Sequence, residues 1–225
     1  MKVLLRMACG WALLSIVAWA HAGDSAPPLL LSDNFEKGID AWQPNDPQAW
    51  KQIDVGGEHQ HVFSHFKQAN YKPKYRSPVN YALLKKWIVS DFTLEADCQS
   101  TVKPYDHQDL CLFFGYQGPD QYYYSHLGKK TDDHANQIFI VNKAERTKIS
   151  TKTTPGTPWT EGWHHVKVVR TIANGRIAVY FDDMKEPVQT AADKTFAWGQ
   201  VGIGSFDDLG NWDNVKLSGI QVEKK

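Results

Sequence analysis

Short stretches in which apolar and polar residues alternate recur along this chain from residue 29 to residue 222. The clearest is Phe92-Thr-Leu-Glu-Ala-Asp-Cys98, where the alternation is unbroken. Because successive side chains of a strand point to opposite faces, this pattern predicts a β-strand with one face in a core. The residues expected on the core face are Phe92, Leu94, Ala96 and Cys98.

Other segments with this period, or with dense apolar runs, are bounded by Gly, Pro, Asn and Asp, the residues of turns. Asn174-Gly175 lies between two of them and predicts a hairpin with a type I′ turn. Residues 82–87 would also fit a helical turn. Many short strands with regular turn signals predict an all-β fold, a two-sheet antiparallel jelly-roll sandwich. The expected strands are 29–35, 92–98, 110–116, 121–127, 137–141, 163–171, 177–181, 201–205 and 215–222.

The N-terminal residues have the pattern of an export signal. Lys2 and Arg6 precede an apolar run over 11–20, and Ala20-His21-Ala22 has the small residues of a cleavage site. The run is shorter than the roughly 20 residues that a membrane-spanning helix needs. We therefore expect a secretory signal peptide over 1–22, a linker over 23–28 and one domain over 29–225. The protein would be secreted or periplasmic, without a membrane span.

Charge and composition limit the classes of molecule that this protein is expected to bind. The chain has 25 basic and 25 acidic side chains, and the predicted signal peptide removes two basic ones. A near-neutral, slightly acidic protein without runs of like charge gives no reason to expect nucleic-acid binding. Nine Trp and nine Tyr residues permit stacking on sugar rings, although such residues also fill sandwich cores. We expect a monomer.

Two cysteines remain after the predicted signal peptide, Cys98 and Cys111. They lie on strands that follow each other in the sequence. In an oxidising compartment such a pair predicts a disulfide, and two packed free thiols are the alternative.

The richest cluster of chemically active side chains lies over residues 105–137. Tyr122, Tyr124 and His126 are two residues apart, so they would share one face of a strand. There the rings could stack on a sugar while the imidazole bonds a hydroxyl or moves a proton. The alternative is an ordinary strand and solvated turns. The catalytic candidates are His126, His134, Tyr124 and Arg76, and the substrate-binding candidates are Tyr122, Asp106, His107, Gln137 and Lys129.

Several motifs of the C-terminal half resemble the concanavalin A-like lectin/glucanase superfamily, with a laminin-G-like jelly roll close to the 3-keto-disaccharide hydrolase-type domain family. They are Trp163-His164-His165-Val166, Arg170, Gly175, Val179-Tyr180-Phe181-Asp182-Asp183, the stretch 201–208 and Trp212-Asp213-Asn214-Val215, with Asp33-Asn34-Phe35 as the partner strand.

This resemblance implies a scaffold shared by lectins, glycosidases and polysaccharide lyases. Many members hold a structural calcium, for which Asp33, Glu36 and Asp213 are the candidates; no other cofactor is expected. Arg76, Gln137, His126 and Tyr124 supply the residue types of jelly-roll lyases, but the Gln-x-His pattern of those enzymes is absent. The Glu-x-Asp-x-Glu motif of retaining glucanases is also incomplete at Glu95-Ala96-Asp97.

Two functions are compatible with these residues. The first is a secreted carbohydrate-active domain that binds a saccharide in the groove of the sandwich and cleaves it by hydrolase- or lyase-type acid–base chemistry. The second is a non-catalytic, lectin-like glycan-binding or adhesion module. The Tyr- and His-rich segment favours the first function, a glycan-degrading enzyme. An envelope scaffold without a glycan ligand is a third alternative.

Overall fold

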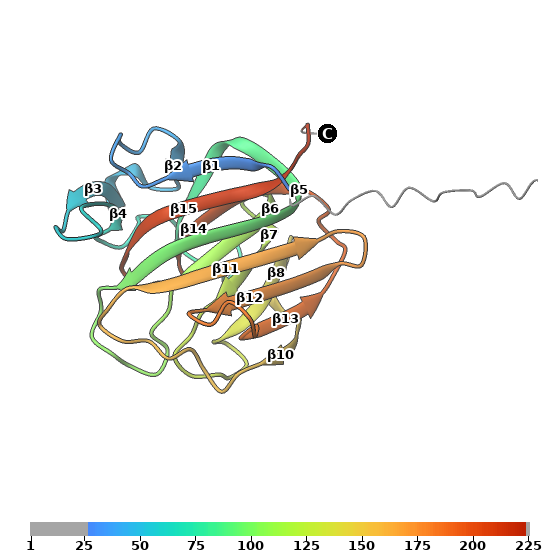
Figure 1. The fold of residues 1–225 in the computed structure, drawn as a ribbon. Helices are drawn as coiled ribbons and strands as arrows, with labels where there is room; N and C mark the ends of the chain where they lie inside the picture. Colours follow the sequence, from blue (N-terminus) through green and yellow to red (C-terminus); the bar gives the residue numbers. More distant parts are fainter. Residues whose placement is uncertain (1–26, 224–225) are drawn as a thin grey trace, which may run out of the picture.

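The structure is a computed structural model that describes residues 27–223, so the predicted signal peptide lies outside the described residues. The described chain forms a β-sandwich, and Figure 1 shows its two layers, with β6, β7 and β8 behind β5, β11 and β12. The expected two-sheet antiparallel sandwich is confirmed. Among residues 27–223 there is no helix with the length and apolarity needed to cross a bilayer.

The long strand β5, Asn80–Ser100, belongs to both layers. Its first half pairs with β14 through Asn80 to Val89, and its second half pairs with β15 and β11 through Val89 to Ser100. The register with β14 shifts between Gln200 and Gly202, opposite the point where β5 passes from one layer to the other. Residues 82–87 are therefore part of a strand, and the helical alternative is wrong.

The first sheet runs β5-β14-β6-β7-β8-β9, with β2 on the other edge of β5. Its remaining strands are β2 Trp42–Pro44, β6 Cys111–Gly118, β7 Gln121–His126, β8 Gln137–Asn142, β9 Thr147–Lys148 and β14 Gly199–Ser205.

The second sheet runs β15-β5-β11-β12-β13-β10, and β15 also pairs with β1 and β4 while β4 pairs with β3. Its strands are β1 Leu29–Asp33, β3 Trp50–Asp54, β4 His61–His65, β10 Ser150–Thr153, β11 His164–Thr171, β12 Arg176–Phe181, β13 Gln189–Ala192 and β15 Gly210–Gln221. A short 3₁₀ helix, Pro47–Ala49, precedes β3.

The main core lies between the sheets. The predicted face of β5 is confirmed, because Phe92, Leu94, Ala96 and Cys98 are all buried there. The hairpin between β11 and β12 also lies where Asn174-Gly175 predicts it. Its turn differs from type I′, because the N–H of Gly175 donates to the carbonyl of Ile172 and Gly175 is the residue with positive φ, +75°. This is a type I turn followed by a left-handed glycine.

A second apolar cluster, here called the outer cluster, lies on the face of the first sheet that points away from the main core. Its members are Tyr81, Leu83, Cys111, Phe113, Tyr122, Tyr124, Phe139 and Val141. The irregular segment 66–79 contributes Tyr71, whose ring packs edge-on against Tyr81 at 5.7 Å between centroids. A loop of this length without secondary structure is uncommon and usually functional. Segment 66–79 therefore packs against part of the outer cluster.

Candidate functional site

Four of the predicted residues, brought from separate loops and one strand end, line one small pocket of about 140 Å³. They come from segment 66–79, the loop before β6, the end of β7 and the loop between β7 and β8. Four further side chains complete the wall. The lining residues are Arg76, His107, His126 and His134, with Tyr105, Arg146, Phe206 and Asp207.

His126 forms the buried floor of this pocket and is 4% exposed. Its Nδ1 accepts the backbone N–H of Asn136 at 3.3 Å, so the neutral ring carries its proton on Nε2. Nε2 lies 3.8 Å from Oδ2 of Asp109. Burial, and secondarily the charge of Arg146, lower the pKa of His126 to about 3. At neutral pH this histidine is an uncharged donor through Nε2.

Arg146 is held from two sides in the pocket wall. Its Nη1 donates to the hydroxyl of Tyr124 at 2.7 Å. Its guanidinium lies over the rings of Phe139 and Phe206, 4.4 and 4.3 Å from their centroids. Planar stacking and a fixed donor pre-organise an arginine fork for a planar anion such as a carboxylate.

Arg76 is the second guanidinium of the pocket. Its backbone N–H donates to Oε2 of Glu145 at 2.9 Å, which ties segment 66–79 to the turn that carries Arg146. In the described part of the chain, neither guanidinium has a carboxylate within ion-pair distance. Two cations without a carboxylate at ion-pair distance therefore share one concave site. Its wall also contains Asp207, and the charges of both arginines oppose the rise that burial causes in the pKa of that carboxyl.

His107 and His134 lie at the exposed rim. Nε2 of His107 is 2.7 Å from Oδ2 of Asp132. Oδ1 of the same carboxylate accepts the backbone N–H of His134 at 2.6 Å. An imidazole oriented by a carboxylate is an arrangement that acid–base catalysis uses.

The structure places the other site candidates differently. Tyr122 and Tyr124 do share a face, as predicted, but they are 1% and 0% exposed, so as they stand they cannot stack on a sugar.

The other polar candidates lie outside the pocket. Gln137 is buried and its Nε2 donates to the carbonyl of Asp132. Asp106 is exposed and pairs with Lys130 outside the pocket. The side chain of Lys129 also does not line the pocket.

The predicted disulfide is wrong, because both Cys98 and Cys111 are free and buried. The strands β5 and β6 follow each other in the sequence, but β14 lies between them in the sheet. Cys98 faces the main core, whereas Cys111 faces the outer cluster and donates its thiol to Oδ2 of Asp109 at 3.2 Å.

The three carboxylates expected to hold a structural calcium do not converge. Oδ2 of Asp33 accepts the indole N–H of Trp42 at 2.9 Å. Glu36 pairs with His61 at 2.6 Å, and Asp213 pairs with His59 at 2.8 Å. Each carboxylate is turned toward its own partner. A structural calcium at the first and last strands stays a prediction.

Four lining residues were not predicted: Tyr105, Arg146, Phe206 and Asp207. Arg146 lies in a Glu-Arg-Thr turn without any local signal of function, and only the fold brings it to Tyr124. Phe206 and Asp207 follow β14 inside a stretch that was interpreted as a fold motif. Tyr105 belongs to the His-rich segment, and its place beside His107 was the one available signal.

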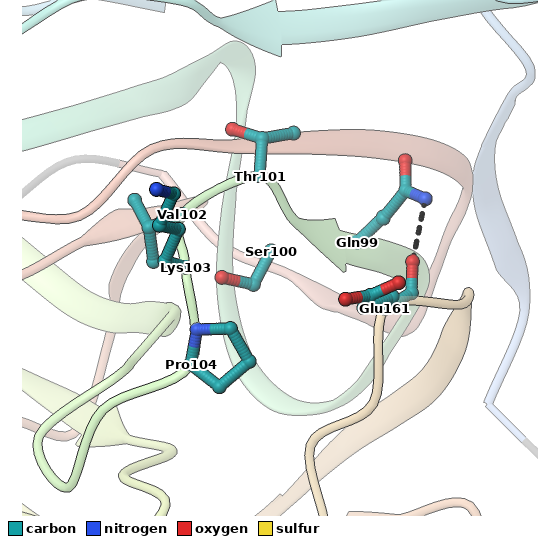
Figure 2. Close-up of a pocket in the computed structure, with 7 residues that line it drawn as sticks. All are labelled: Gln99, Ser100, Thr101, Val102, Lys103, Pro104 and Glu161. Atoms are coloured by element: carbon teal, nitrogen blue, oxygen red, sulfur yellow. Dashed lines mark hydrogen bonds between the residues drawn. The ribbon is translucent and has the colours of Figure 1, made fainter.

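A wider hollow of about 340 Å³ lies elsewhere, lined by the end of β5 and the loop after it. Figure 2 shows Nε2 of Gln99 donating to the carbonyl of Glu161 across this hollow, at 2.9 Å. Lys103 and Glu161 are its only charged side chains, and the rest of the lining is Gln99, Ser100, Thr101, Val102 and Pro104. It gathers no imidazole or guanidinium, in contrast to the smaller pocket.

Solved structures of other proteins share this fold. Carbohydrate-binding module CBM66 from Bacillus subtilis matches with a TM-score of 0.56 and 18% identity, over 80% of this chain and 96% of that one. Domain 4 of AbnA, a GH43 extracellular arabinanase from Geobacillus stearothermophilus, in complex with arabinotriose, has a TM-score of 0.56 at 10% identity, over 88% and 96%. Winged bean acidic lectin complexed with methyl-α-D-galactose has a TM-score of 0.54 at 13% identity, over 85% and 97%.

These likenesses confirm the lectin-like sandwich. No protein-family model matches the sequence, and no curated protein matches it. The resemblance to one particular family of this superfamily stays a prediction.

Proposed function

We propose that this protein binds an acidic saccharide, with one sugar residue in the pocket between Arg76, Arg146 and His126. The observation that carries the proposal is the pair of unpartnered guanidiniums in a pocket whose floor is an uncharged imidazole donor. The two arginines would hold a carboxylate or sulfate, and His126 would donate Nε2–H to a ring oxygen or hydroxyl.

The fold supports a saccharide over other small anions. Its structural neighbours include a carbohydrate-binding module and a lectin that was solved with a bound sugar. The pocket also offers Tyr105, which is 43% exposed, as an apolar surface for a sugar ring. A volume of about 140 Å³ suits one sugar residue or a chain end better than a long enclosed chain.

A glycan array tests this proposal. The expected result is retention of uronate- or sulfate-bearing glycans and little retention of their neutral counterparts. The signal should fall steeply with added salt, because the attraction is between charges. Equal retention of neutral and acidic glycans, or no retention at all, would overturn it.

Cleavage of the bound saccharide is a second candidate function, favoured by the contact between His107 and Asp132 at the rim. His107 would move a proton to or from the glycosidic bond or the ring, and Arg76 with Arg146 would stabilise the charged sugar. His126 suits a positioning role better, because its low pKa and occupied Nδ1 leave it uncharged.

Long incubation with an acidic oligosaccharide separates cleavage from simple binding. A cleaving enzyme releases new reducing ends by hydrolysis or an unsaturated uronate by elimination. His107→Ala should then lose product formation while it keeps the affinity for the saccharide. Binding without any product favours the lectin-like alternative.

A further inference from the structure

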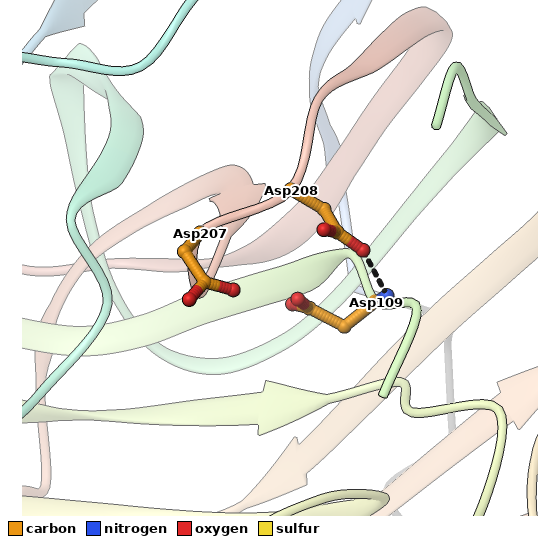
Figure 3. A group of neighbouring side chains, drawn as sticks. All are labelled: Asp109, Asp207 and Asp208. Atoms are coloured by element: carbon orange, nitrogen blue, oxygen red, sulfur yellow. Dashed lines mark hydrogen bonds between the residues drawn. The ribbon is translucent and has the colours of Figure 1, made fainter. Parts of the chain in front are cut away.

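Three aspartates meet at the inner side of the pocket. Asp109 precedes β6, and Asp207 and Asp208 lie in the turn between β14 and β15. One carboxylate oxygen from each lies within 4.8 Å of the others. Figure 3 shows the three carboxylates pointing toward one another from these two segments.

The carboxylate of Asp109 carries an unpaired oxygen in this cluster. The residue is 0% exposed, and among the described residues its Oδ1 has no hydrogen-bond partner. Its Oδ2 accepts the N–H of Phe206 at 2.8 Å as well as the Cys111 thiol. Buried polar atoms are almost always paired, because an unpaired one loses its hydration without compensation. Oδ1 is therefore free to bind a cation.

No lysine or arginine of the described chain pairs directly with this cluster, although the charges of Arg76 and Arg146 act on Asp207 and oppose the rise that burial causes in its pKa. In the described residues no Lys or Arg lies within ion-pair distance of the three carboxylates. Within 4 Å of the cluster lies Nε2 of His126, 3.8 Å from Asp109, and that ring is uncharged at neutral pH. Three like charges at this spacing repel one another unless a cation or a proton lies between them.

Two of the carboxylates are already held in place. Oδ1 of Asp208 accepts the hydroxyl of Tyr105 at 2.7 Å, and its Oδ2 accepts the backbone N–H of Asp109 at 2.8 Å. Such contacts orient a carboxylate without using all its lone pairs. Asp207 is exposed, so an ion can reach the cluster from solvent.

We propose that Asp109, Asp207 and Asp208 bind a hard divalent cation of the calcium class. The donors are all oxygens, the set that Ca²⁺ and Mg²⁺ prefer and that does not suit Zn²⁺ or Cu²⁺. The ion joins the start of β6 to the turn between β14 and β15, and Oδ1 of Asp109 is its buried ligand. This site shares Asp207 with the wall of the saccharide pocket, but its test measures metal binding and does not rest on saccharide binding.

Titration of the EDTA-treated protein with Ca²⁺ tests the site. Calorimetry measures the binding, and thermal unfolding measures its effect on stability. We expect saturable binding, and a melting temperature that rises by roughly 3 to 6 °C for each tenfold increase in Ca²⁺ above its Kd. Mg²⁺ in place of Ca²⁺ measures the preference between the two hard ions.

Asp207→Asn is the main variant, because an exposed residue is replaced by one of the same shape. It should weaken Ca²⁺ binding at least tenfold, and Asp109→Asn should abolish it. Asp133→Asn, which removes an exposed carboxylate paired with Lys148 nearby, is the matched control and should change the affinity less than twofold.

Absence of heat and of a melting shift with both ions at millimolar concentration would overturn the proposal, as would unchanged affinity in Asp207→Asn. A proton between the carboxylates is the competing explanation. It predicts a stability that falls as pH rises above about 4 and that no divalent ion restores.

Discussion

Nε2 of His126 lies 3.8 Å from Oδ2 of Asp109 below the floor of the pocket, and neither side chain is more than 5% exposed. Burial raises the pKa of Asp109, and the charge of Asp208 raises it further, while burial lowers the pKa of His126. The two groups have opposite shifts for the same reason, since water is excluded from both.

This burial makes the stability of the protein depend on pH. The pKa of His126 in the folded state, about 3, is below its ordinary 6.5, so the unfolded chain binds the proton more tightly. The contribution of neutral His126 to the free energy of unfolding is complete above pH 6.5 and is lost as pH falls. The free energy of unfolding should decrease by about 2 kcal/mol between pH 7 and pH 5 for this reason. Chemical denaturation of wild type and His126→Gln over this range checks it. The variant should lack this part of the slope, and equal slopes would contradict the assignment.

His65 is a second source of the same dependence. Burial lowers its pKa to about 4. The dependence of stability on pH should therefore be weaker in His126→Gln than in wild type, but the variant should keep the part that comes from His65. Removing both histidines should reduce the slope from pH 7 to pH 5 further than either single variant does.

Tyr124 is a positioning residue for Arg146. Tyr124→Phe keeps the ring in the outer cluster and removes the hydroxyl that accepts Nη1. We expect affinity for an acidic saccharide to fall roughly three- to tenfold, because an interaction of about 1 kcal/mol no longer fixes the guanidinium. Tyr122→Phe is the matched control, since Tyr122 is equally buried in the outer cluster and makes no bond to Arg146. Equal losses in both variants would show a general packing effect.

The close approach of β14 to β5 depends on Gly204. A Cβ at this position would lie 2.1 Å from the carbonyl oxygen of Asn80. Gly204→Ala should therefore lower the free energy of unfolding by about 3 kcal/mol or more, measured by urea denaturation. Gly118→Ala, where a Cβ meets no atom within 4 Å, should change it by about 1 kcal/mol or less. A mild effect at Gly204 would mean that the strands separate easily.

The thiols of Cys98 and Cys111 should behave as buried and unbridged. Burial raises the pKa of both. We expect mass spectrometry of an alkylated sample to show labelling of both residues after denaturation without reductant, and none in the native protein. Reductant should leave the melting temperature unchanged. A Cys98–Cys111 peptide pair would contradict the strand order.

The parts of the fold that local pattern dictates could be predicted. The alternation of apolar and polar residues alone predicts the buried face of β5. Phe92, Leu94, Ala96 and Cys98 all lie on one side of the strand, so only that side can face the core. The disulfide fails because sequence order does not reveal that β14 separates β5 from β6. The candidate site is also predicted in part by local sequence and in part only by tertiary structure. His107, His126 and His134 belong to one segment rich in active side chains, but Arg146 reaches them only through tertiary structure. The same structure buries Tyr122 and Tyr124 in the outer cluster.

The pairing of Arg146 with an acidic saccharide is the central claim, and calorimetric titration tests it most directly. An acidic oligosaccharide found by the array, and its neutral counterpart, are titrated into wild type, Arg146→Gln and the exposed control Arg176→Gln. The account predicts that Arg146→Gln alone weakens binding of the acidic sugar, by about tenfold or more. Unchanged affinity in Arg146→Gln, or no difference between the acidic and the neutral sugar, would contradict it.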